Sequence, residues 1–216
     1  MKRLMWDYKH IIGSSFLSII LVVNRADSIV DQLNPSSFQR FADWCENKEK
    51  LPPATRYTVE VLLGEAGTQD CDRADEILGN LTEIQLGGNQ IVDVQPLSTL
   101  TNLTDLSLGF NEISDITPLS LLTNLRWLNL AANKISNVES LSALTNLTGL
   151  SLHSNQIVNI QPLSKLTKLN ILHLQYNQIV NIDSLSGLNK LEWLNLSGNP
   201  LANPLCPVKP ETICQF

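Results

Sequence analysis

The sequence lacks the features that mark several large classes of protein. Acidic residues outnumber basic ones, 21 to 15, and the formal net charge is −6, whereas nucleic-acid-binding proteins ordinarily gather an excess of Lys and Arg into a stripe. The body of the chain has no run of 18 apolar residues, no low-complexity tract and no block of like charge. We therefore expect a globular protein with no nucleic-acid partner and no membrane span in its mature form.

Signatures of catalysis are lacking as well. The sequence contains no G-x-S-x-G, no H-E-x-x-H and no phosphate-binding loop, which are the motifs that would indicate hydrolase, metalloprotease or nucleotide chemistry. We expect a protein that is not an enzyme and that uses no cofactor.

The N-terminal residues 1–26 differ in character from the rest. A basic start with Lys2 and Arg3 is followed by the apolar run Ile11–Val23, which at 13 residues is short for a bilayer span of about 20. This order predicts a secretory signal peptide, cleaved after Ala26, and a location that is secreted, periplasmic or at the cell surface. An uncleaved membrane anchor is the alternative interpretation.

Four cysteines accompany this leader. They permit three pairings, and the simplest is Cys45 with Cys71 and Cys206 with Cys214, because the two pairs flank the central part of the chain. An exported protein reaches an oxidising compartment, where such pairs form disulfides. The spacings do not match a zinc site, and no histidine lies near either pair.

The central part of the chain repeats every 22 residues. Leucine recurs in register from Leu81 to Leu191, and a second column is always asparagine: Asn89, Asn111, Asn133, Asn155, Asn177 and Asn199. A fixed period of this length predicts a solenoid, in which no coil buries its own apolar face and stacked coils share one core.

Each repeat has the form L-x-x-L-x-L-x-x-N-x-I-x-x-(I/V)-x-P-L-x-x-L-x-x. Its first part alternates apolar and polar residues and predicts a short strand. The invariant asparagine is expected in a buried turn, where its amide bonds the backbone of neighbouring coils in a structural Asn ladder. The return arm, with proline at three of five positions, predicts a short helical turn.

This unit resembles the 22-residue leucine-rich repeat of bacterial internalins and is similar to that of the leucine-rich regulatory subunit of type-one protein phosphatase. The resemblance covers residues 81–205 as five full repeats and a truncated sixth. With a Cys-bearing helical segment before the repeats and a Cys-bearing tail after them, the chain also resembles exported leucine-rich repeat proteins of cyanobacteria and other bacteria. The resemblance implies an α/β fold, a right-handed solenoid with short parallel strands on the concave face and 3-10 turns and loops on the convex face. Internalins carry an immunoglobulin-like domain after the repeats and often a wall anchor; the sequence to Phe216 shows neither, so the resemblance implies no role in host-cell invasion.

Both ends of a solenoid need caps. Residues 27–80 predict a helical N-terminal cap, with Asn34 and Pro35 starting a helix whose apolar stripe includes Phe38 and Phe41. The tail has four prolines within 11 residues, which predicts that it forms no further coil and that residues 206–216 fold over the last one as a Cys-containing cap. The truncated repeat and this tail argue against end-to-end stacking, so a monomer is expected.

The variable positions of each strand are expected to form the concave face. The third, fifth, seventh and eighth residues of every repeat point outward there, and past the second repeat they are uncharged and carry several aromatics. Exposed aromatics among small polar residues are typical of a recognition surface. The predicted partner-binding residues are Trp127, Trp193, Tyr176, Phe110, Ile171, Asn129, His153, His173 and Asn195.

Two of these predictions have alternatives. The aromatics could instead pack against neighbouring strands and merely cover the sheet. His153 and His173 fall on adjacent strands, but no Cys, Asp or Glu joins them from neighbouring outward positions, so two solvated histidines are expected rather than a metal site.

The sequence thus favours a non-catalytic exported module that binds a protein, or a glycan, on its concave face. Two other functions stay open: an intracellular regulatory subunit like the phosphatase partner, which would keep its leader and reduced thiols, and a structural cell-surface protein.

Overall fold

The computed structural model describes residues 37–216 and divides the chain into two units, Met1–Phe38 and Gln39–Phe216. The predicted signal peptide and the first ten residues of the predicted cap lie outside the described residues. All that follows concerns the described part of the chain.

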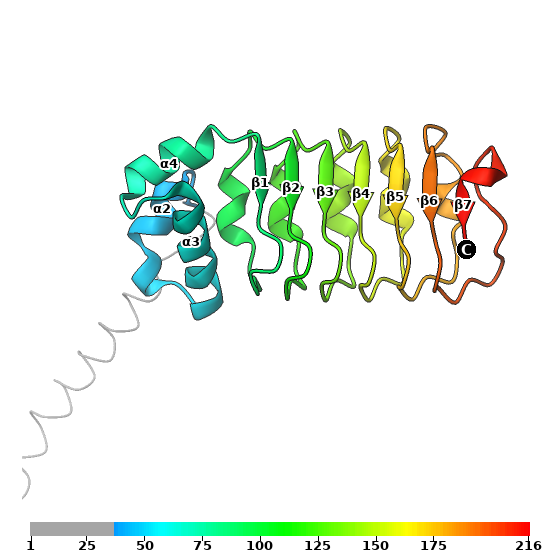
Figure 1. The fold of residues 1–216 in the computed structure, drawn as a ribbon, viewed down its shortest axis with the longest axis horizontal. Coiled ribbons are helices and arrows are strands. Elements are labelled where there is room, and N and C mark those ends of the chain that lie inside the picture. The colour runs from blue at the N-terminus through cyan, green and yellow to red at the C-terminus, as the bar shows by residue number, and fades with distance from the viewer. Residues whose placement is uncertain (1–36) are drawn as a thin grey trace, which may run out of the picture. The chain divides into compact units, whose positions relative to one another are not determined.

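Three helices form the start of the second unit: α2 (Phe41–Glu46), α3 (Pro53–Ala66) and α4 (Cys71–Gly79), with a 3-10 turn η2 (Lys48–Lys50) between the first two (Figure 1).

The predicted helix start at Asn34 and Pro35 lies outside the described residues. Within them, α2 begins at Phe41, because the Asp43 carboxylate reaches back to accept the backbone N–H groups of Gln39 and Arg40 at 2.8 and 3.0 Å. Phe38 therefore precedes the helix instead of sharing its apolar stripe. The start of α4 is fixed in a similar way, since Asp70 accepts the backbone N–H of Arg73. Large apolar side chains, among them Trp44 and Leu62, are buried between these helices.

A single parallel sheet runs through the rest of the unit (Figure 1). Each three-residue strand pairs in register with the residues 22 positions away on the next strand. The strands are β1 (Glu83–Gln85), β2 (Asp105–Ser107), β3 (Trp127–Asn129), β4 (Gly149–Ser151), β5 (Ile171–His173), β6 (Trp193–Asn195) and β7 (Cys214–Gln215).

Short 3-10 turns return the chain behind the sheet, as the repeat predicts. They are η3 (Gln95–Thr99), η4 (Thr117–Leu121), η5 (Glu139–Ala143), η6 (Gln161–Lys165) and η7 (Asp183–Leu185), with η8 (Glu211–Ile213) in the tail. Each of the first five begins where an Asp or Asn side chain accepts a backbone N–H two residues further on, as Asp93 does from Gln95. We number the coils 1 to 6 from Leu81, each starting 22 residues after the last. The leucine-rich repeat solenoid with a helical N-terminal cap is confirmed.

The repeated asparagines lie inside the turn that follows each strand. Asn133 is 8% exposed, its amide oxygen accepts the backbone N–H of Ile113 at 3.0 Å, and its NH2 group donates to the carbonyls of Leu108 and Leu130. Asn111, Asn155 and Asn177 repeat this arrangement. Asn199 keeps the bonds but is half-buried, and Asn89, also half-buried, supplies a backbone N–H to Asn111. The polar column thus satisfies backbone groups that the stacking of coils would otherwise leave unpaired.

The C-terminal tail departs from the sequence prediction. It folds over coil 6, but it also adds a seventh strand: β7 pairs with β6, and the backbone N–H of Leu196 donates to the Gln215 carbonyl at 2.7 Å. Prolines at the start of the tail do not prevent this, because the two residues that pair come after the last of them.

Both disulfides have the connectivity expected from the sequence. Cys45 joins α2 to Cys71 at the start of α4, and Cys206 joins Cys214 in β7.

Candidate functional site

The outward side chains of the strands form what we call the open sheet face, made of the third, fifth, seventh and eighth residues of each coil. Strand alternation creates it, because the fourth and sixth residues point into the core, where Leu128 and Leu130 are fully buried. At each of these four positions, the outward side chains of the six coils therefore line up in a column across the sheet. This is the arrangement that the sequence predicts.

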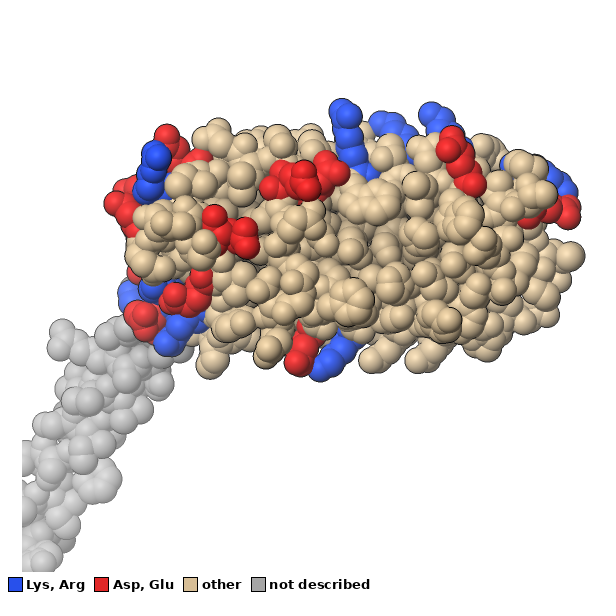
Figure 2. Space-filling view, viewed as in Figure 1, with Lys and Arg blue, Asp and Glu red and all other residues tan. Residues whose placement is uncertain are grey.

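Charge is distributed unevenly over this face. Glu83 and Asp105 occupy the third position of coils 1 and 2, whereas the outward positions of coils 3 to 6 carry no Asp, Glu, Lys or Arg. Figure 2 shows this as an uncharged expanse over β3 to β6, with charged side chains on the helical cap and along the edges. A surface of this kind is desolvated at little electrostatic cost.

Trp127 lies across the neighbouring strand. A Cβ atom built on Gly149, its partner in register on β4, would come within 2.0 Å of Trp127 Cε3. The indole therefore occupies the space of the missing side chain, and Gly149 is buried beneath it. The half-buried ring thus packs over the neighbouring strand, and its outer surface stays exposed on the open sheet face.

Ile171 and Trp193 continue the same column. They pair in register on β5 and β6, where Ile171 is half-buried and Trp193 is 39% exposed. Together with Trp127 they form an apolar stripe along the third position of coils 3 to 6.

Phe110 and Tyr176 stand at the eighth position, where the backbone turns out of the strand. Both have left-handed backbones, φ 58° and 57°, and both are mostly exposed, at 69% and 65%. Glycine favours that conformation, and it occupies the same position in coils 1 and 6 as Gly88 and Gly198. Tyr176 also leans on the next coil, since a Cβ on Gly198 would lie 2.6 Å from Tyr176 Cδ1.

A shallow hollow of about 270 Å³ lies on this face between coils 2 and 5. Five predicted site residues meet there: Phe110, Trp127, Asn129, His153 and His173. Ile171, Tyr176, Trp193 and Asn195 lie on the same face outside the hollow. Its other lining residues, Ala131, Ser151 and Gln175, were not singled out from the sequence, although each occupies an outward column, and that was the signal available.

The two histidines supply the polar chemistry of the hollow. Burial lowers the pKa of His153, and burial together with the charge of His153 lowers the pKa of His173. His153 Nδ1 lies 3.1 Å from the Ser154 hydroxyl, whereas His173 Nδ1 and the Gln175 Oε1 atom are buried without a hydrogen-bond partner. Neutral imidazole and amide groups are of the kind that both accept and donate hydrogen bonds. Among residues 37–216, no three His, Cys, Asp or Glu side chains come together in a way that could hold a metal ion.

The two predicted asparagines are held by their own strands. The amide oxygen of Asn129 accepts the backbone N–H of Ala131, and that of Asn195 accepts the N–H of Ser197, both at 3.0 Å. Asn129 also donates to the Ser107 hydroxyl at 3.2 Å. These contacts leave Asn195 more of its NH2 donors for a partner than Asn129 retains.

Comparison with known families matches the repeats throughout. Models described as leucine rich repeats match residues 79–121 and 123–165, residues 145–201 and residues 190–216. No curated protein matches the chain significantly in sequence.

Several solved structures share the fold. Internalin F of Listeria monocytogenes is 26% identical, with a TM-score of 0.55 over 68% of this chain and 51% of that one. Internalin C2 of the same organism is 27% identical, with a TM-score of 0.54 over 76% of this chain and 91% of that one. The leucine-rich repeat ectodomain of the Arabidopsis thaliana receptor kinase GASSHO1/SCHENGEN3, solved in complex with Casparian strip integrity factor 2, is 28% identical, with a TM-score of 0.52 over 58% and 17%. The chain thus spans about half of the internalin F chain that it matches.

Two disulfides and internalin-like neighbours indicate an extracytoplasmic protein. Within the part of the chain that the structure describes, no helix has the length and apolar character needed to cross a bilayer.

Proposed function

Since the chain belongs to the leucine-rich repeat proteins, we propose that it is an exported, non-catalytic binding module that recognises a protein partner on the open sheet face. The hollow around Trp127 is the centre of this surface, and the apolar stripe that ends at Trp193 extends it. The observation that carries the proposal is the uncharged face of coils 3 to 6 with exposed aromatic rings.

The eighth position of the coils adds weight to this assignment. A bulky residue in the left-handed region is strained by about 1 kcal/mol or more relative to glycine. Phe110 and Tyr176 are mostly exposed, so burial in the free chain offsets little of that strain. Burial of these rings against a partner would offset the strain that the free chain leaves uncompensated.

The likeness to solved relatives supports the class of partner. The plant ectodomain that shares this fold was solved in complex with Casparian strip integrity factor 2, and leucine-rich repeats typically bind proteins. The proposal includes export through a leader, residues 1–26, that is then cleaved. It also includes a relationship to exported leucine-rich repeat proteins of cyanobacteria. The two disulfides disfavour the intracellular regulatory subunit, because cytosolic thiols are kept reduced.

Affinity capture of extracytoplasmic proteins of the source cell on the immobilised chain tests the proposal. The comparison is between the unmodified chain, a Trp127→Ala/Trp193→Ala double variant, and Leu121→Ala as the matched control. Leu121 is 60% exposed on η4, behind the sheet. A partner that uses the open sheet face is retained by the unmodified chain and by Leu121→Ala.

The affinity of that partner for the double variant should fall by about 2 kcal/mol or more, since central aromatics dominate such interfaces. Thermal unfolding of each variant checks that the solenoid remains intact. Equal affinity of all three chains would show that the open sheet face is not the binding surface.

A further inference from the structure

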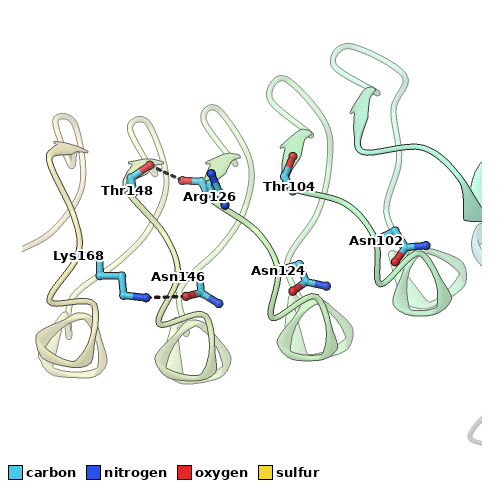
Figure 3. A pocket seen from close by; sticks show the side chains of 7 residues that line it. All are labelled: Asn102, Thr104, Asn124, Arg126, Asn146, Thr148 and Lys168. Atoms are coloured by element: carbon cyan, nitrogen blue, oxygen red, sulfur yellow. Dashed lines mark hydrogen bonds between the residues drawn. The ribbon is translucent and has the colours of Figure 1, made fainter.

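A second groove lies at the edge of the sheet where the strands begin, apart from the open sheet face. Its volume is about 450 Å³, within the range of small-ligand sites. The residues that flank the first leucine of coils 2 to 5 line it, and Figure 3 labels them. Its lining is polar throughout, with amides, hydroxyls and two cations.

The amides of this groove are held in fixed orientations. The NH2 groups of Asn102 and Asn124 donate to backbone carbonyls 23 residues earlier, that of Gly79 at the end of α4 at 2.7 Å and that of Thr101 in coil 1 at 2.9 Å. Their amide oxygens accept no hydrogen bond from the residues that the structure describes. The groove therefore presents preorganised acceptors, which are suited to a ligand with O–H donors.

The hydroxyl groups add further acceptors. Thr148 donates its O–H to the Arg126 carbonyl at 3.1 Å (Figure 3), and Thr104 lies within bonding distance of the Thr82 carbonyl and the Asp105 carboxylate. Because each O–H is directed into the protein, the oxygen lone pairs remain for a ligand.

Two cations complete the lining. The Lys168 ammonium reaches back along the stack to the Asn146 amide oxygen at 2.7 Å, a neutral partner (Figure 3). Among residues 37–216, no side chain forms an ion pair or a hydrogen bond with the exposed Arg126 guanidinium. Arg126 follows the first leucine of coil 3 and Lys168 precedes that of coil 5, two steps along the stack, so their backbones are separated by roughly 10 Å.

These cations are departures from the repeat. The flanking residues follow the template N-L-T in coils 2 and 4, but read N-L-R at Arg126 and K-L-N at Lys168. Both departures introduce positive charge into one groove, while the net charge of the chain is −6. No Asp or Glu lines the groove, although the Asp105 carboxylate is next to Thr104. A local positive potential in an acidic protein selects anions.

We propose that this groove binds an acidic saccharide, a sugar chain that carries carboxylate groups. Its hydroxyls donate to the fixed Asn and Thr oxygens, and its carboxylates accept from Arg126 and Lys168. Neither half of the lining is sufficient alone: the acceptors would admit a neutral sugar, and the cations would admit any anion. This site is separate from the protein-binding surface and does not depend on it.

Isothermal titration calorimetry of the full chain at low salt tests the proposal with three probes. Trigalacturonate carries both hydroxyls and carboxylates, its methyl ester keeps the hydroxyls alone, and propane-1,2,3-tricarboxylate keeps the charge alone. We expect binding of trigalacturonate at millimolar concentrations and at least about tenfold weaker binding of the other two.

Variants locate the site. Arg126→Gln/Lys168→Gln should weaken trigalacturonate binding by at least about tenfold, because two charge-assisted contacts are lost. Thr148→Val should weaken it several-fold without disturbing the coil, since the Arg126 carbonyl still accepts the backbone N–H groups of Thr148 and Gly149. The matched control is Lys190→Gln, at the same repeat position as Lys168 but outside the groove and two residues from Glu192, which should bind like the unmodified chain.

Three outcomes overturn the proposal. Unchanged binding in the Arg126→Gln/Lys168→Gln variant would place any saccharide elsewhere. Equal affinity for the tricarboxylate would reduce the groove to a general anion site. No heat of binding with trigalacturonate at millimolar concentrations would exclude this class of ligand. Thermal unfolding of the variants, whose substituted side chains are exposed, confirms that a lost signal is not lost folding.

Discussion

The two ends of the solenoid solve the same problem by different means. At the N-terminal end, α2, α3 and α4 cover coil 1 with a core of their own, in which Trp44 and Leu62 are buried. At the C-terminal end, Val208 is the one apolar side chain of residues 201–216 that is buried, and the end is closed by the short strand β7 and a disulfide. An end can therefore be capped by buried apolar area or by backbone pairing held with a disulfide. We expect only the first kind of cap to unfold cooperatively with the rest of the solenoid.

Removing the two disulfides one at a time should give the largest difference in stability between the two ends. In the chain-entropy description, losing Cys45–Cys71, with a separation of 26 residues, destabilises by about 3.5 kcal/mol, and losing Cys206–Cys214, with a separation of 8, by about 2.5 kcal/mol. The paired Ser variants of the first bridge should lower the thermal midpoint of the whole unit.

The second pair of Ser variants should act locally. The Leu196 amide, which donates to Gln215, should lose its protection from hydrogen exchange while the midpoint changes less. Equal effects on the midpoint from both pairs would show that the ends unfold as equivalent caps.

Core truncation sharpens the same contrast. Leu62→Ala removes a fully buried side chain from the helical cap and should destabilise by about 3 kcal/mol. Val208→Ala, in the tail, should destabilise by about 1.5 kcal/mol, because fewer buried methyl groups are lost. Urea denaturation measures both, and a larger effect at Val208 would reverse the assignment of the stronger cap.

The Asn ladder compares the middle of the stack with its end. Asn133→Ala leaves the buried N–H of Ile113 without its acceptor and should destabilise by about 2 kcal/mol. Asn199→Ala should destabilise less, because Asn199 is half-buried and water can replace its bonds. Chemical denaturation of the two variants measures the loss of unfolding free energy in each. Equal losses would show that water reaches the C-terminal coil no better than it reaches the middle coils.

The smallest expected effect is the pH dependence of the middle coils. The pKa values of His153 and His173 are lowered from 6.5 in the folded chain, so the unfolded chain binds more protons as the pH falls. Their contribution to stability is therefore complete above that value and is lost as the pH falls through it.

The variant His173→Gln should accordingly lose less stability than the unmodified chain between pH ~7.5 and ~5.5, measured by thermal unfolding. A larger loss in His173→Gln would contradict the direction of the shift.

Sequence periodicity was sufficient for the repeated part of the fold. The strands fall at the third to fifth residues of each coil, and the 3-10 turns fall on the return arm, because leucine burial and the Asn turn act identically in every copy. Strand β7 could not be foreseen, since Cys214–Gln215 has no leucine pattern and pairs only through its backbone. The helix start at Phe41 depends on a single contact from Asp43 that propensity does not specify.

The candidate site was predictable by column but not by contact. Outward positions could be listed from the period alone, yet the Trp127 ring, which lines the hollow, takes its place because Gly149 leaves room for it. This contact joins two residues that are 22 apart in sequence. It depends on which residue occupies the third position of the next coil. The unassigned lining residues Ser151 and Gln175 have the same origin, since they are defined by neighbours and not by their own type.

In-register pairing of the coils makes distance along the open sheet face a counted quantity. Trp127 and Trp193 are three coils apart, which corresponds to roughly 14 Å at the usual strand spacing. Duplicating or deleting one 22-residue unit between them would lengthen or shorten this distance by one strand spacing. Neither residue's own surroundings in the strand would change. The distance between two contact points on a partner that such a face can match thus changes only in steps of one repeat. The chemistry of each contact stays the same.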